Sequence, residues 1–164
     1  MKSLLTAAVL AIAALAPVNA AEQKPAAQPA EGGKETYASG LGEIMSLQQM
    51  RHLKLWFAGA AKNWALADYE LDELTEGFDD LIKFFPVKDE IPLSQMAGST
   101  VVPMLPELKS AIEARDGGKF AAAFDKLTAA CNSCHQASNH GFIVIQRPTT
   151  SPYSNQSFAP PRKQ

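Results

Sequence analysis

Both cysteines of the chain and one of its three histidines lie together near the C-terminus, in the sequence Cys131-Asn132-Ser133-Cys134-His135. Four chemistries use cysteines at this spacing: zinc binding, a redox dithiol, a structural disulfide and covalent attachment of haem. In haem attachment, the two thiols bond the two vinyl-derived carbons along one porphyrin edge, and the adjacent imidazole binds iron. C-x-x-C-H is the recognised spacing for this chemistry.

The other three chemistries fit the motif less well. Zinc usually takes four ligands from two paired motifs, and this chain has one C-x-x-C and no second pair. A reactive dithiol is expected at the N-terminus of a helix in an α/β domain, whereas this motif is predicted at a helix C-terminus, where the dipole disfavours a thiolate. A disulfide between residues three apart closes a very short loop and stabilises little. The disulfide remains the alternative to haem.

The elements that must position this motif are helices. Apolar residues recur at spacings of three and four in four stretches, which cover residues 41–62, 64–85, about 99–116 and 119–137. Asn63 is a suitable N-cap for the second stretch, and Pro86 stops it. Four amphipathic helices with short links predict an all-α fold, an antiparallel four-helix bundle, with the cysteine motif at the end of the last helix.

The third predicted helix is bounded by capping residues, prolines and glycines. Residues 87–98 are expected to be a connection. Ser99 or Thr100 is the expected N-cap, and Pro106 should lie in the first helical turn, where a missing N–H is tolerated. Gly117 and Gly118 are expected to end this helix.

The N-terminal segment has the layout of a secretory signal peptide. One lysine precedes an almost purely apolar run over residues 4–16, followed by Pro17 and a small-residue pattern that predicts cleavage after Ala20. The run is shorter than the roughly 20 residues that span a bilayer. Residues 21–40 are rich in Ala, Pro, Gln and Gly and predict a flexible linker. These features predict export to the periplasm, with residues 1–20 removed.

The charge balance restricts the partners. The net charge is −2, and removing residues 1–20 makes it one unit more negative. A weakly acidic chain is unsuited to nucleic acid or to an anionic membrane surface, and it is compatible with docking to a basic face of another protein. No later segment is long and apolar enough to span a membrane.

On its motif and helix pattern the chain resembles the class II c-type cytochromes, a family that includes cytochrome c′. The resemblance covers residues 41–138, and "CNSCH" is its specific motif. The stretches "LQQMRHLKLWFAGAAKNWALADYELDEL" and "FIVIQRPTTSPYSNQSF" also look like those of small proteobacterial exported cytochrome-like proteins. The chain departs from the family in its tail, residues 139–164, which we expect to lie extended against the bundle.

The resemblance implies one covalent haem c, with Cys131 and Cys134 as thioether sites and His135 as proximal iron ligand. It implies electron transfer to a redox partner protein and no enzymatic reaction. Where the sixth position of iron is vacant, it implies binding of NO or CO. Members of the family often form homodimers through the first two helices.

The family places any sixth iron ligand on the first helix. There, Met45 and His52 lie two turns apart on one face. Counting helical turns from both ends of the expected helices favours His52, with Met50 and Met45 as alternatives. The competing interpretation is that His52 is a hydrogen-bonded core histidine and that the methionines fill the core.

Four further side chains are candidates for the haem propionates. His140 follows the last helix and is expected on the proximal side, exposed or near a propionate. Arg51, Lys126 and Arg147 are the cations suited to pair with propionates, and ordinary solvation is the alternative for each.

Overall fold

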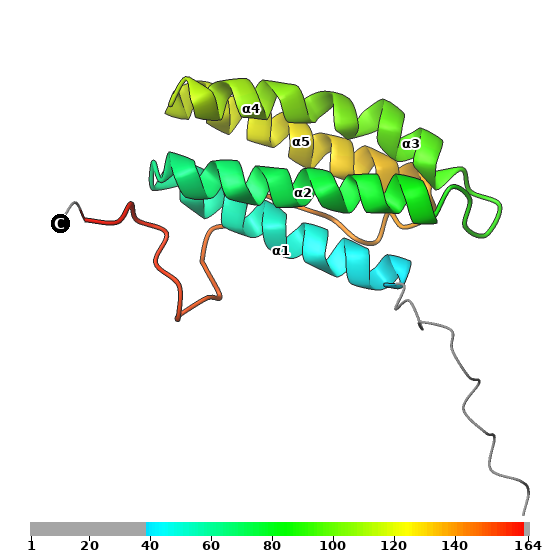
Figure 1. Ribbon diagram of the computed structural model, residues 1–164. Helices are drawn as coiled ribbons and strands as arrows, with labels where there is room; N and C mark the ends of the chain where they lie inside the picture. The colour runs from blue at the N-terminus through cyan, green and yellow to red at the C-terminus, as the bar shows by residue number, and fades with distance from the viewer. Residues whose placement is uncertain (1–38, 163–164) are drawn as a thin grey trace, which may run out of the picture. The chain divides into compact units, whose positions relative to one another are not determined.

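The computed structural model describes residues 39–162 (Figure 1). The expected signal peptide, residues 1–20, and all but the end of the expected linker lie outside the described residues. Within them, five α-helices and one 3₁₀ helix form: α1 Leu41–Ala60, α2 Trp64–Phe84, α3 Leu93–Thr100, η1 Val102–Met104, α4 Leu105–Glu113 and α5 Gly117–Ala137. The only β pairing among residues 39–162 is a single bridge between Lys88 and Ile91. The all-α prediction is therefore confirmed for this part of the chain.

The helices lie side by side along most of their length (Figure 1). α1 packs against α2 and α5, α2 packs against α3 and α4, and α4 packs against α5. Among the described helices, none combines the length and the apolar character that crossing a membrane requires.

The turn between α1 and α2 follows the capping signals of the sequence. The side chain of Asn63 accepts a hydrogen bond from the backbone N–H of Leu66 (3.4 Å), so the predicted N-cap is confirmed. Lys62 has a left-handed φ of 58°, which ends the helical path before it. As a result α1 ends at Ala60, two residues earlier than predicted.

The predicted start of the third helix was wrong. Residues 93–100 form α3 inside the stretch expected to be a connection, and Ser99 and Thr100 are its last residues instead of an N-cap. Both hydroxyls donate back to the carbonyl of Met96 (3.2 and 2.7 Å), as they do inside a helix. Pro103 lacks the N–H that would continue an α-helix, so η1 interrupts the path. Pro106 lies in the first turn of α4, as predicted.

The expected helix end at Gly117 and Gly118 was also wrong, because these glycines begin α5. The carboxylate of Asp116 accepts hydrogen bonds from the N–H groups of Gly118 and Lys119 (both 3.0 Å), which makes Asp116 a strong N-cap. The left-handed turn expected of glycine is taken by Arg115, with a φ of 53°.

The core lies between the helices, and its largest fully buried side chains are two phenylalanines of α5. Phe120 and Phe124 are fully buried, and their rings contact Trp56 at centroid distances of 6.2 and 5.0 Å. Gly59 permits this packing, because a Cβ atom there would lie 2.2 Å from the Phe120 ring. α1 and α5 therefore approach closely in their buried halves.

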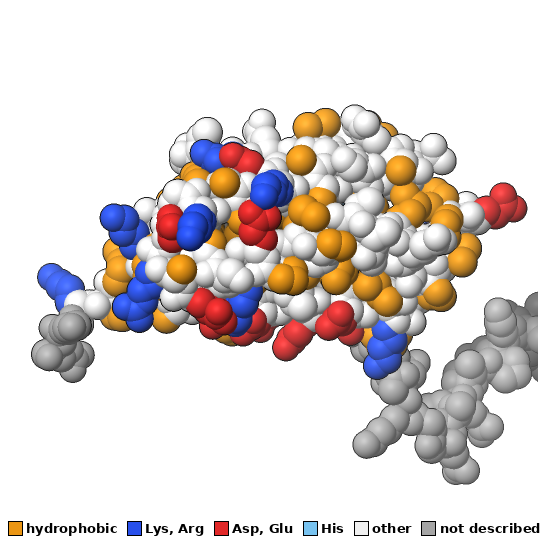
Figure 2. Space-filling view, turned by 90° about the horizontal axis from the view of Figure 1, so that it is seen from above, with side chains coloured by type: hydrophobic (Ala, Val, Ile, Leu, Met, Phe, Trp, Pro, Cys, Tyr) orange, Lys and Arg blue, Asp and Glu red, His pale blue; other side chains and the backbone are white. Residues whose placement is uncertain are grey.

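Acidic side chains are frequent along α2, and part of them pair with cations. They are Asp68, Glu70, Asp72, Glu73, Glu76, Asp79 and Asp80. Asp68 and Asp72 accept hydrogen bonds from Lys109 of α4 (2.6 and 3.3 Å). On the face seen in Figure 2, acidic and basic side chains lie next to one another. Exposed ion pairs of this kind contribute little to stability. We therefore interpret this acidic surface of α2 as a solvent-exposed face that adds little to the stability of the fold.

Residues 139–162 form no helix or strand and follow the helical body, in line with the expected extended tail. The tail is held at both ends. The side chain of Asn132 is hydrogen-bonded to the backbone of Ile145, and near the C-terminus Asn63 Nδ2 donates to the carbonyl of Ala159 (3.2 Å). The ring of Phe158 also packs on Phe57 at 5.5 Å.

Candidate functional site

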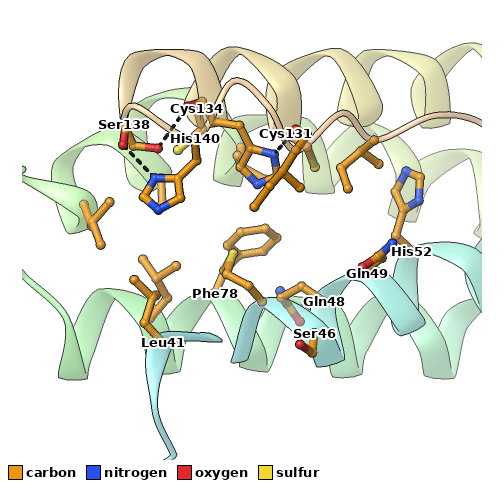
Figure 3. Close-up of a pocket in the computed structure, with 18 of the residues that line it drawn as sticks. Leu41, Ser46, Gln48, Gln49, His52, Phe78, Cys131, Cys134, Ser138 and His140 are labelled. Atoms are coloured by element: carbon orange, nitrogen blue, oxygen red, sulfur yellow. Dashed lines mark hydrogen bonds between the residues drawn. The ribbon is translucent and has the colours of Figure 1, made fainter. Parts of the chain in front are cut away.

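An apolar cavity of about 320 Å³ lies where the start of α1, the end of α2, α3 and the end of α5 meet (Figure 3). Residues 138–145 of the tail complete its wall. Cys131, Cys134 and His135 all line it, so the fold brings the three residues of the motif to one cavity. Its size lies within the range of about 300–1,000 Å³ that ligand pockets occupy.

The two cysteines lie one turn apart on α5, and neither is in a disulfide. Burial raises the pKa of Cys131 to about 12, and the neighbouring thiol adds to the effect. Burial also raises the pKa of Cys134. The surroundings therefore favour the neutral thiols and disfavour a reactive thiolate.

The imidazole of His135 is oriented by the tail. Its Nδ1 lies 2.9 Å from the carbonyl oxygen of Ile143. A carbonyl can only accept, so Nδ1 carries the proton and donates it. In the neutral ring the proton-free nitrogen is then Nε2, the state in which a histidine binds a metal.

His52 also lines the cavity, but its ring is held by the core. Its Nε2 lies 2.9 Å from the hydroxyl of Thr128, which itself donates to the carbonyl of Phe124 (2.9 Å). His52 therefore donates to Thr128, and its ring lies 4.3 Å from that of Phe124. Thr128 precedes His135 by seven residues, about 10 Å along the helix. To bind iron, His52 would have to use Nδ1 or leave Thr128.

The two methionine candidates are placed differently. Met45 lines the cavity and packs against the core, whereas Met50 is half-buried and does not line it. Because α1 ends at Ala60, counting turns from its true end moves the expected level of the iron two residues toward Met45. The structure thus brings Met45 and His52 to the cavity and leaves Met50 outside it.

The tail contributes to the cavity wall, which the sequence pattern did not predict. At Asn139 the backbone turns with a φ of 62°, and His140, Ile143 and Ile145 line the cavity. His140 donates from Nδ1 to the carbonyl of Ser138 (2.7 Å; Figure 3). The isolated apolar run directly after a turn-forming Asn-His-Gly sequence was the signal for this return.

The expected propionate partners lie elsewhere. Arg51, Lys126 and Arg147 pair with the carboxylates of Glu73 (3.1 Å), Glu107 (2.6 Å) and Asp125 (3.0 Å from Nε), and none of the three cations lines the cavity.

Within residues 39–162, no group of three or more His, Cys, Asp or Glu side chains is arranged to hold a metal ion. Comparisons of the chain with protein-family models, with curated proteins and with solved structures found no match.

The buried histidine predicts a pH dependence of stability. Burial lowers the pKa of His52 to about 4, and the side chain is only 4% exposed. Above pH 6.5 the imidazole is neutral in both folded and unfolded chains and contributes nothing. Between pH 6.5 and 4 the unfolded chain binds the proton first, so the free energy of unfolding falls by about 3 kcal/mol over this window.

We expect urea unfolding of the wild-type chain to give a lower free energy of unfolding at pH 4.5 than at pH 7, and protonation of His52 accounts for part of this difference. His52→Gln retains a donor for Thr128 but does not titrate, so its loss should be smaller by about 2 kcal/mol over this span. His140→Gln, which replaces an exposed histidine, is the matched control and should behave as wild type. Equal acid sensitivity of His52→Gln and wild type would contradict the assignment.

Proposed function

We propose that this chain is an exported c-type cytochrome, with one haem attached to Cys131 and Cys134 and bound through its iron by His135. One observation carries the proposal: both thiols and an imidazole with its Nδ1 already engaged line a single apolar cavity. When bound, haem c supplies one-electron redox chemistry at the iron.

The residues of the cavity fit this group. The two sulfurs are one turn apart on the same helix, α5, and their burial disfavours a reactive thiolate. His135 offers Nε2 and holds a proton at Nδ1. The mostly apolar walls lower the polarity around the iron, which is one of the means by which a protein adjusts its potential.

The proposal includes the antiparallel four-helix bundle predicted for residues 41–138. In this arrangement α1, α2 and α5 are three of the four helices, and α3, η1 and α4 together take the remaining position. The tight turn at Lys62 and Asn63 supports it, as does the packing of α1 on α2 and of α4 on α5. The same arrangement is what the resemblance to class II cytochromes implies.

Electron transfer is the favoured use of the haem, and the chain itself would catalyse no reaction. Met45 and His52 both line the cavity from α1, on the side facing α5, and either side chain is of a type that closes the sixth position. The alternative function, binding of NO or CO at an open sixth position, is favoured by the hydrogen bond that already engages His52 with Thr128.

The redox partner would be a protein with a basic face. Glu76, Asp79 and Asp80 are exposed on the second half of α2, next to the cavity-lining residues Phe78 and Leu81. A basic partner docked there would approach the haem end of the molecule. Export to the periplasm and a homodimer through α1 and α2 complete the proposal.

A denaturing haem assay tests the proposal after expression of the full chain with a c-type haem-maturation system. We expect covalent haem in the wild-type chain and none in the Cys131→Ser, Cys134→Ser double variant. Ser133→Ala, which alters an exposed residue of the same motif, should retain the haem. Absence of covalent haem from the wild type, or equal haem in the double variant, would refute the proposal.

Carbon monoxide separates the two uses. A six-coordinate ferrous form that resists CO supports electron transfer, and rapid CO binding to a five-coordinate form supports the gas-binding alternative.

A further inference from the structure

The tail returns along α5 immediately after the helix ends. His140 N–H donates to the carbonyl of His135 (2.7 Å), and Ile143 N–H donates to the carbonyl of His140 (2.8 Å). These two turns reverse the chain at Asn139, so that residues 138–147, which we call the strap, run back beside the cysteine motif. The carbonyl that orients His135 belongs to Ile143, in the middle of the strap.

The side chain of Asn132, within the cysteine motif, forms two hydrogen bonds to the strap. Asn132 Nδ2 donates to the carbonyl of Ile145 (2.8 Å), and Ile145 N–H donates to Asn132 Oδ1 (2.7 Å). A single amide thus satisfies both backbone groups of one residue, two positions beyond the carbonyl that holds His135. Such a pair of hydrogen bonds fixes the height of the strap along α5 as well as its distance from it.

Arg147, at the end of the strap, is a further anchor that holds the strap against the helices. Arg147 Nε donates to Asp125 (3.0 Å), and its guanidinium lies 4.3 Å from the centre of the Trp56 ring. The reversal at Asn139, the amide of Asn132 and the side chain of Arg147 together hold the strap at three points. Ile143 lies between the reversal at Asn139 and the residue held by Asn132, so its carbonyl has little freedom to move away from His135.

We propose that Asn132 is a positioning residue for the proximal ligand, acting through the strap. By fixing the carbonyl of Ile143, it keeps the proton of His135 on Nδ1 and turns Nε2 toward the cavity. A carbonyl that accepts from Nδ1–H strengthens the donation of electrons from Nε2 to a bound metal, which favours ferric over ferrous iron. Asn132 therefore lowers the reduction potential of the haem. This inference rests on the proposed function.

The test compares Asn132→Ala with wild type in the full haem-loaded chain. We expect covalent haem in both, because the thiols are unchanged. In the variant, the backbone N–H of Ile145 and the Nδ1–H of His135 should exchange faster with solvent by NMR, and the reduction potential should rise. Ser133→Ala is the matched control, since its hydroxyl donates within α5 to Ala129 and touches no part of the strap. It should leave all three measurements unchanged.

Faster exchange at Ile145 with an unchanged potential would overturn the proposal, because the strap would then be structural only. Unchanged exchange at Ile145 would overturn it as well. Asn132→Asp keeps the acceptor for Ile145 N–H and loses the donor, so exchange at Ile145 N–H should rise less than in Asn132→Ala. Because the added carboxylate itself lowers the potential, the exchange rates are the readout for this variant. Asn132→Asp replaces Asn132→Ala if the alanine variant does not fold.

Failure of the proposed function is distinguishable from failure of this inference. If the wild-type chain carries no covalent haem, the tautomer of His135 can still be read from its ¹⁵N chemical shifts. The Nδ1–H form should dominate in wild type and lose its dominance in Asn132→Ala. The same tautomer populations in both chains would overturn the role of Asn132 without reference to haem.

Discussion

Replacing His135 with alanine is expected to abolish the spectroscopic signature of the proximal iron ligand while leaving the haem covalently attached. The two thioethers do not depend on the imidazole, so the denaturing haem assay should be unchanged. The absorption spectrum should lose the contribution of the proximal ligand, and added imidazole should restore it, because the apolar cavity retains space at that position.

His140 is the control that makes this experiment specific. It lines the same cavity, and because its Nδ1 donates to the carbonyl of Ser138, its Nε2 is also left without a proton. His140→Ala should keep the spectrum of wild type. A normal spectrum in His135→Ala, together with its loss in His140→Ala, would move the proximal role to His140.

The second large effect concerns the packing that holds α1 against α5. Phe124→Ala should lower the free energy of unfolding by about 3–5 kcal/mol, because it empties a fully buried site. The ring of Phe124 packs at 4.3 Å from His52 and at 5.0 Å from Trp56, so its removal also loosens the wall of the cavity next to the motif. Urea unfolding at neutral pH measures the loss.

Phe142→Ala is the matched control for this substitution. Phe142 is 80% exposed, so the same chemical change should alter stability by no more than about 0.5 kcal/mol. A loss below about 1 kcal/mol for Phe124→Ala would mean that the neighbouring side chains collapse into the space, against the packing described.

The confirmed predictions of helix boundaries were those in which a single residue type determined the local structure. Asn63 caps α2 and Pro106 lies in the first turn of α4, because an N-cap oxygen and a missing N–H each have few other suitable positions. Apolar spacing also located α1, α2 and α5 to within a few residues.

The errors came from residues with two competing roles. Ser99 and Thr100 can cap a helix from outside or bond to the preceding turn from inside, and burial of Leu93 and Ala97 selects the second role by extending the helix toward the N-terminus. Glycine can end a helix or follow an N-cap, and the carboxylate of Asp116 selects the latter.

The candidate site was predictable in its motif but not in its surroundings. The spacing of Cys131, Cys134 and His135 is local, so helical geometry alone places them on one side of α5. The return of the strap depends on hydrogen bonds between residues 13 positions apart, and no periodicity in the sequence reports such contacts.

The carbonyl of Ile143 has a consequence for how this site tolerates sequence change. Every residue type has the same backbone oxygen, so the hydrogen bond to His135 persists when another apolar side chain replaces Ile143 in the cavity wall. The amide of Asn132 has no such freedom, since it must donate and accept at once. Among related chains with the same strap, asparagine between the two cysteines and a constant number of residues from His135 to the strap are therefore the expected invariants.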